Sequence, residues 1–170
     1  MQLVVDRIRT DGGTQSRAQI NWLTVTDYAA DIAEGATFPP VVVYFDGADY
    51  WLADGFHRLE AHKRLGLVEI AADVKQGTRR DAILYSVKAN AIHGLRRTND
   101  DKRRAVDMIL ADEEWFARSD PWIAKVCGVS DSLVYTRRPL SPLFKRGEPE
   151  PRRYRTKHGT EAVMNTANMG

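Results

Sequence analysis

Cysteine is almost absent from the sequence, which has a single one, Cys127, among 170 residues. One cysteine forms neither an internal disulfide nor a cysteine-based zinc site, and the letters around it, IAKVCGVS, predict a small buried apolar position. Long apolar runs are also missing. No stretch approaches the roughly 18 residues that a membrane helix needs, and the start MQLVVDRIRTDGG lacks a basic segment followed by an apolar one. We therefore expect a cytoplasmic protein with no membrane partner.

The net charge is small, +2 at pH 7, but it is unevenly distributed. Ten basic and twelve acidic residues lie up to Leu95, whereas fifteen basic and eleven acidic residues follow it, so the first part has a net charge of −2 and the second +4. An excess of cations suits a surface that faces phosphates, but a solvated helix face has the same composition. Charge alone leaves both interpretations open.

The first 95 residues alternate between strand and helix signals, which predicts an α+β domain over residues 1–95. A helix capped by Thr24 would bury one face, with apolar residues at i, i+3, i+4 and i+7. The other expected elements are a strand at 2–5, a hairpin formed by 39–45 and 50–53, a helix after Gly55, a strand at 70–75, and a helix that starts at a Thr78/Asp81 capping box and ends near Ile92.

After residue 95 the pattern becomes helical, which predicts a small all-α domain over residues 96–139. Thr98 and Asp101 fit a second capping box, and Ala105, Val106 and Ile109 form a core-facing stripe after it. Residues 140–170 are rich in Pro, Gly, Arg and Glu with little periodicity, so we expect a basic flexible tail. Such a tail either adds salt-sensitive affinity for DNA or remains solvated and idle.

The segment WLADGFHRLEAHKRLG places a glycine turn between a strand and a helix. Backbone N–H groups and the positive end of a helix meet at such a turn, and His57 and Arg58 add donors, so a phosphate fits there. The alternative is that Gly55 only permits a tight turn and that Arg58 pairs with Asp54. The residues alone do not decide between these interpretations.

This segment resembles the ParB and sulfiredoxin superfamily, and the resemblance extends over about residues 1–95. ADGFHRLEAHKRLG is similar to the arginine-rich box of ParB proteins, and GFHR is similar to the phosphate loop of sulfiredoxin. The resemblance implies that Gly55, His57 and Arg58 bind the phosphates of a nucleotide, with Ala61 packing the helix against the sheet. The implied cofactor is CTP or ATP with Mg²⁺.

Two departures narrow what the resemblance implies. Phe56 stands where sulfiredoxin has its cysteine, which excludes sulfur-transfer repair chemistry. The second ParB box usually has Glu-Asn, and the nearest match here is Ala89-Asn90, so Asn90 joins the implied nucleotide site without a neighbouring carboxylate for the metal. We assign no catalytic residue and no metal ligand.

The segment SDPWIAKVCGVSDSLVYTRRP has the spacing of a DNA-binding helix-turn-helix. Ala124 allows close contact between two helices, Gly128 permits the turn, and Ser130 caps a second helix that Pro139 stops. The expected contacts are base readers on the exposed side of that helix, Ser130, Asp131, Ser132, Tyr135 and Thr136, and phosphate contacts from Arg137 and Arg138. The alternative is a helical packing motif without a DNA partner.

We therefore expect an α+β ParB/sulfiredoxin-like domain followed by a small all-α helix-turn-helix domain. The leading hypothesis is a ParB-like protein that binds double-stranded DNA in plasmid or phage maintenance or in transcriptional regulation, modulated by a nucleotide and associated with the nucleoid or a plasmid. Helix-turn-helix readers are commonly homodimers.

The alternatives are an enzyme, which cleaves DNA or hydrolyses or transfers a nucleotide phosphate, and a non-catalytic interaction module. A nuclease needs clustered carboxylates, and Asp46, Asp49 and Asp54 are close in sequence, but the first two have the spacing of hairpin-turn residues.

Overall fold

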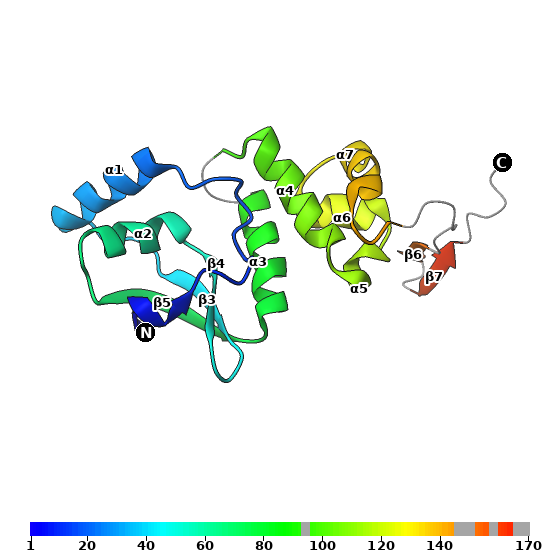
Figure 1. Cartoon of the computed structure of the whole chain (residues 1–170). Coiled ribbons are helices and arrows are strands. Elements are labelled where there is room, and N and C mark those ends of the chain that lie inside the picture. Colours follow the sequence, from blue (N-terminus) through cyan, green and yellow to red (C-terminus); the bar gives the residue numbers. More distant parts are fainter. Residues whose placement is uncertain (93–95, 145–151, 157–159, 165–170) are drawn as a thin grey trace. The chain divides into compact units, whose positions relative to one another are not determined.

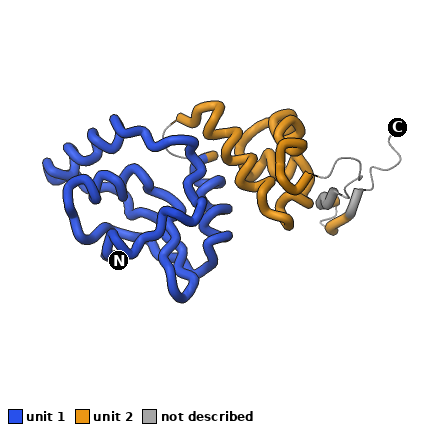
Figure 2. Tube along the Cα trace, in the orientation of Figure 1, with its two compact units in different colours: residues 1–90 blue, residues 91–170 orange. Residues whose placement is uncertain are grey.

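The computed structural model describes residues 1–92, 96–144, 152–156 and 160–164. The chain divides into two compact units, Met1–Asn90 and Ala91–Gly170, which we call unit 1 and unit 2 (Figure 2). Within the described ranges, no helix is both long and apolar enough to cross a membrane.

Unit 1 is built on a five-stranded mixed sheet (Figure 1). Its strands are β1 (Gln2–Val4), β2 (Ile8–Arg9), β3 (Val41–Phe45), β4 (Tyr50–Asp54) and β5 (Glu69–Gln76), in the order β1-β5-β3-β4-β2. The outer strand β1 pairs antiparallel with β5, and the outer strand β2 pairs parallel with β4. The central strand β3 pairs parallel with β5 and antiparallel with β4. The predicted hairpin is confirmed as β3 and β4. The two-residue strand β2 was not predicted, because its register depends on a partner that lies about 40 residues away in the sequence.

The two faces of the sheet are covered by different helices. Unit 1 contains the helices η1 (Val5–Arg7), α1 (Trp22–Ala33), α2 (Phe56–Arg64) and α3 (Arg79–Ile92), the last of which runs into unit 2. Because successive side chains of a strand point to opposite faces, Val41 and Val43 are buried with Leu59 of α2, whereas Val42 is buried with Ala82 of α3. The capping box of α3 is confirmed, since Thr78 N donates to Asp81 Oδ2 at 2.8 Å and Asp81 N donates to Thr78 Oγ1 at 3.3 Å.

Helix α1 differs from its prediction at one end. Asn21, not Thr24, is the N-cap, and its side chain accepts hydrogen bonds from Leu23 N and Thr24 N at 3.1 and 3.3 Å. Asparagine caps a helix at least as well as threonine, so the helix starts earlier. Ala61 of α2 was expected to pack against the sheet, but it is buried with Val25 and Ala29 of α1. That expectation was wrong because α1 forms a further layer over α2.

Unit 2 is mostly helical. Its elements are α4 (Asn99–Leu110), α5 (Glu113–Phe116), α6 (Asp120–Cys127), α7 (Asp131–Arg137), η2 (Arg138–Leu140), β6 (Arg152–Arg155) and β7 (Glu161–Met164). The second capping box is confirmed: Asp101 N donates to Thr98 Oγ1 at 3.1 Å, and Thr98 N donates to Asp101 Oδ2 at 2.8 Å. Helix α4 contacts α5, α6 and α7, and its predicted apolar stripe is buried.

The segment expected to be a flexible tail contains an antiparallel strand pair. β6 and β7 pair from Arg152 opposite Met164 to Arg155 opposite Glu161. The composition concealed this pairing because neither four-residue strand has an apolar alternation of its own. Residues 145–151, 157–159 and 165–170 lie outside the described residues, so flexibility of the tail stays a prediction.

Candidate functional site

The glycine turn, residues Asp54–Arg58, leads from β4 into α2. Gly55 is the N-cap of α2 at φ 97°, and no side chain of the described residues caps the helix. A side chain at Gly55 would place its Cβ 2.6 Å from Cγ1 of Val41. Only glycine combines this backbone conformation with such close packing. The first backbone N–H groups of α2 have no acceptor within the helix, so they can donate to an anion.

The guanidinium of Arg58 is engaged at the base of the same turn. It donates to Asp54 Oδ2 at 2.8 Å, to the carbonyl of Pro40 at 3.0 Å and to the carbonyl of Pro39, and its side chain is 14% exposed. The pair with Asp54, which was one of the two interpretations of this sequence, therefore exists. Arg58 ties α2 to the chain that enters β3, and its contact with a phosphate stays a prediction.

His57 is buried, and its ring faces α1. Nε2 accepts a hydrogen bond from the backbone N–H of Asn21 at 3.1 Å, so this nitrogen carries no proton. Asn21 is also the N-cap of α1. His57 therefore links the first turns of two helices, and its expected role as a phosphate ligand stays a prediction.

Asn90 belongs to a polar contact between α3 and the loop that precedes α1. Its Nδ2 donates to Ser16 Oγ at 2.9 Å and to the Ser86 carbonyl at 3.0 Å, and Ser16 Oγ donates to the same carbonyl at 3.2 Å. Thr14, in the same loop, is fully buried, and its Oγ1 has no hydrogen-bond partner within the described part of the chain. Sequence reasoning missed this loop, although the non-periodic polar run TQS after two glycines was a signal.

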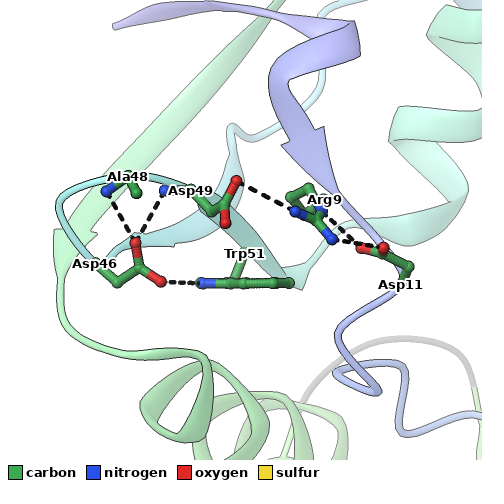
Figure 3. Close-up of polar contacts among 6 residues, drawn as sticks. All are labelled: Arg9, Asp11, Asp46, Ala48, Asp49 and Trp51. Atoms are coloured by element: carbon green, nitrogen blue, oxygen red, sulfur yellow. Dashed lines mark hydrogen bonds and ion pairs between the residues drawn. The ribbon is translucent and has the colours of Figure 1, made fainter.

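The carboxylates of Asp46 and Asp49 stabilise the β3–β4 hairpin through hydrogen bonds and an ion pair (Figure 3). Asp46 Oδ1 accepts from the backbone N–H groups of Ala48 and Asp49 at 2.9 Å, and its Oδ2 accepts from Trp51 Nε1 at 2.6 Å. The hydrogen bonds from the Asp49 backbone, Trp51 and the Ala48 backbone lower the pKa of Asp46 to about 2. Asp46 thus closes the turn, as its position in the hairpin predicted.

Arg9 fastens this hairpin to β2. It lies over the Trp51 ring, 4.9 Å from the centroid, and pairs with Asp11 at 2.7 Å and Asp49 at 3.3 Å. The hydrogen bond from Arg9 lowers the pKa of Asp11. Across the described ranges, no three His, Cys, Asp or Glu side chains gather to hold a metal ion. The hairpin carboxylates therefore give the nuclease alternative no support.

The second candidate site is the helix pair α6–α7 of unit 2. Ser119 and Ser130 cap the two helices, and Gly128 ends α6 at φ 59°. Ala124 is buried at 2% exposure, and Ile123 and Val134 are fully buried. Burial raises the pKa of the Cys127 thiol to about 12, which agrees with its predicted place in the core. The sequence thus predicted the local geometry of two helices joined by a short turn.

The expected base readers lie on the outside of this pair. All five are exposed: Ser130, Asp131, Ser132, Tyr135 and Thr136. Tyr135 is 66% exposed, which is unusual for a large aromatic side chain. Contact of this face with DNA stays a prediction.

The two arginines expected to contact phosphates form ion pairs with carboxylates of unit 2. Arg138 is only 5% exposed, pairs with Asp120 at 2.7 Å, and donates to the carbonyls of Phe116 and Arg118 at 2.5 and 2.8 Å. The predicted phosphate contact of Arg138 is therefore wrong, since the guanidinium is enclosed by its partners. Arg137 forms a two-point pair with Asp107 and remains 26% exposed.

Arg97 is a structural residue that the sequence analysis did not single out. Its Nη1 donates to the carbonyl of Cys127 at 2.7 Å, and its Nη2 donates to that of Gly128 at 2.8 Å. These carbonyls end α6, where the helix dipole favours a cation. Its distance of 30 residues from Cys127 explains why spacing gave no signal.

Comparison with known proteins identifies the family of unit 1. The ParB N-terminal domain profile matches residues 1–91. A Streptomyces griseus protein described as a possible regulatory protein of the streptomycin biosynthesis operon is 36% identical over 110 residues, 64% of this chain and 30% of that relative. The chain thus spans less than a third of that relative's length.

The solved structures that are similar to this chain include a ParB protein and a sulfiredoxin. One is C-terminally truncated ParB from Caulobacter crescentus in complex with the centromeric parS site, with a TM-score of 0.52 and 17% identity, covering 82% of this chain and 71% of that one. The other is sulfiredoxin from Arabidopsis thaliana, with a TM-score of 0.43 and 25% identity, covering 50% and 93%. Because the ParB N-terminal domain profile matches more than half of the sequence, the chain belongs to the ParB N-terminal domain family.

Proposed function

We propose that this protein is a ParB-like DNA-binding protein that uses α7 to read double-stranded DNA. The observation that carries the proposal is the exposed row of side chains on the first turns of α7, on a helix whose other side is fixed to unit 2. The fold relative from Caulobacter crescentus is bound to its parS site, and the Streptomyces griseus relative is described as a possible regulatory protein. These likenesses support a role in transcriptional regulation or in plasmid or phage maintenance, associated with the nucleoid or a plasmid.

The exposed face of α7 has the groups that base recognition in the major groove needs. Serine and threonine hydroxyls donate to or accept from base edges, a carboxylate accepts from cytosine N4, and apolar groups contact the thymine methyl. Tyr135 has both a large apolar ring and a hydroxyl, and Asp131 is the only anion in this row. We propose that this row reads the sequence and that exposed cations, Arg103 of α4 and Lys125 of α6, contact phosphates. A homodimer would join two half-sites.

We propose that the glycine turn binds the phosphates of CTP or ATP with Mg²⁺ and thereby modulates DNA binding. The support is the uncapped first turn of α2 behind Gly55. Asp54 opposes an anion at this place, but its pair with Arg58 at 2.8 Å offsets the negative charge. His57 and Asn90 would hold the surrounding segments in place through Asn21 and Ser16.

Selection from a random duplex library at near-physiological salt tests the reading function. We expect enrichment of one motif, and we expect its strength to change with CTP or ATP plus Mg²⁺. Tyr135→Ala should lose the enrichment, whereas the control Leu140→Ala, at an equally exposed apolar residue outside α7, should keep it. Intact DNA without enrichment would favour the interaction module, and shortened DNA would favour a nuclease.

Nucleotide binding is tested separately by titrating CTP and ATP with Mg²⁺ into the full chain. We expect Arg58→Ala to weaken binding at least several-fold, because charge-assisted contacts to phosphate are strong. The matched control is Arg64→Ala, on the last turn of the same helix. Equal affinity of the Arg58→Ala variant would overturn a phosphate contact of Arg58, whereas a wild type that binds neither nucleotide would overturn the nucleotide proposal and leave the DNA proposal standing.

A further inference from the structure

The end of α7 is fixed to α4 by one ion pair. Arg137 Nε donates to Asp107 Oδ1 at 2.8 Å, and Arg137 Nη2 donates to Asp107 Oδ2. The hydrogen bond to Asp107 also raises the pKa of Arg137. A guanidinium and a carboxylate that meet at two points fix orientation as well as distance. This pair therefore restrains both the position and the rotation of the last turn of α7.

Helix α7 is short and buries little surface of its own, so its orientation depends on what holds its ends. It comprises seven residues, and Val134 is its one buried side chain. Helices this short are marginal unless tertiary contacts hold them. A single buried side chain within the helix leaves its rotation to be determined largely by the residues at its two ends. At the first turn, the cap from Leu133 N to Ser130 Oγ is long, at 3.4 Å. At the other end, the Asp107–Arg137 pair restrains the last turn of α7, and the buried side chain of the C-cap residue Arg138 anchors the position that follows this turn.

We propose that Asp107 is a positioning residue for DNA recognition: through Arg137 it sets the rotation of α7 and thus the direction of Ser132 and Tyr135. This proposal rests on the proposed function, since it concerns the same helix. A helix of 3.6 residues per turn moves every outer side chain sideways when it rotates, and base contacts depend on such alignment. Asp107 would thus contribute to sequence discrimination without touching DNA.

Because Asp107 is negatively charged, a positioning role and a purely electrostatic role predict opposite changes in DNA affinity when the charge is removed. Asp107 is an anion, 42% exposed at its side chain, on the same helix as the proposed phosphate contact Arg103. Neutralising an anion near DNA strengthens purely electrostatic binding. If Asp107 positions α7, Asp107→Asn instead weakens binding to the selected motif while binding to unrelated DNA stays equal or rises.

The experiment measures affinity for the selected motif and for unrelated duplex DNA with the full-length wild type, Asp107→Asn, Arg137→Gln and the double variant. We expect each single variant to reduce the ratio of the two affinities about 5-fold, and the double variant to reduce it no further than either one. The matched control is Asp100→Asn, which removes a carboxylate that pairs with Arg103 on the exposed surface of α4. This control should leave the ratio unchanged.

The conservative variant Arg137→Lys separates positioning from charge. Lysine keeps the cation but not the two-point geometry, so we expect a reduced affinity ratio with an unchanged dependence of affinity on salt. A ratio equal to wild type in Asp107→Asn, or a further loss when Arg137→Gln is added to Asp107→Asn, would overturn the positioning role. A wild type that prefers no motif would instead overturn the reading function itself, and the positioning role with it.

Discussion

In unit 1 the candidate site consists of backbone at the start of α2, with its side chains bonded internally, whereas in unit 2 the candidate site exposes side chains and uses its arginines internally. At the glycine turn, Arg58 and His57 hold neighbouring segments, and the first turn of α2 has no side-chain cap. At the helix pair, Arg137 and Arg138 hold carboxylates, and the open groups are side chains of α7.

The difference follows from what supports each site. A five-stranded sheet fixes the start of α2, so the turn can leave its first N–H groups uncapped. The candidate site of unit 2 is built on the short helices α6 and α7, of eight and seven residues, so ion pairs and side-chain caps supply part of the restraint. An arginine next to a binding motif can therefore be a structural residue in either setting. Its partners, and not its place in the sequence, decide which role it has.

The largest expected effect on the unfolding free energy comes from removing a buried arginine of unit 2, Arg138. Arg138→Ala removes a buried guanidinium from Asp120 and from two carbonyls, and such losses cost about 3–5 kcal/mol of unfolding free energy. Hydrogen exchange should show faster opening of α6 and α7 with little change in unit 1. The control Arg103→Ala, at an exposed pair, should change the unfolding free energy by less than about 1 kcal/mol. Equal exchange in the two variants would contradict the structural role of Arg138.

The corresponding change in unit 1 is Gly55→Ala. The left-handed backbone and the approach of Val41 together should cost about 2–3 kcal/mol of unfolding free energy. Gly47→Ala is the matched control, because Gly47 has φ 103° but no atom within 4 Å of an added Cβ. It should cost only about 1 kcal/mol. Denaturant unfolding of both variants measures the difference, and equal losses would show that close packing at Gly55 contributes nothing.

A smaller effect concerns the proposed DNA-binding surface of unit 2. If Arg103 contacts a phosphate, Arg103→Gln should lower the slope of log affinity against log salt by about 1 and leave the preferred motif unchanged. Arg138→Gln should leave this slope unchanged in the folded fraction, because the guanidinium is buried. A salt titration of DNA affinity distinguishes them. An unchanged slope in Arg103→Gln would remove that residue from the phosphate contacts.

The smallest effect concerns the hairpin of unit 1. The pKa of Asp46 falls from its ordinary 3.8 to about 2 in the folded protein, chiefly through the hydrogen bond from the Asp49 backbone. The folded state thus favours the carboxylate, so this contribution to stability is present above about pH 4 and is lost as the pH falls toward 2. Asp46→Asn should flatten the decrease of the melting temperature in this range. The same decrease in wild type and variant would contradict the assignment.

Local signals in the sequence were sufficient for much of the fold. The hairpin, the two capping boxes and the Gly128 turn depend on residues within a few positions of one another, and all are present in the structure. Helix α1 began earlier than predicted, because Asn21 competes with Thr24 as a cap. The pairing of β2 with β4 and the loop at Thr14 needed contacts that sequence spacing does not contain.

The sequence by itself determined where the chain turns and which helix faces are apolar, because hydrogen bonds and periodicity act over a few residues. Only the tertiary structure decided what the charged side chains do. Arg97, Arg137 and Arg138 find their partners 18–31 residues away, and a guanidinium binds whichever carboxylate or carbonyl folding brings to it. The same side chain in solvent would be available to DNA.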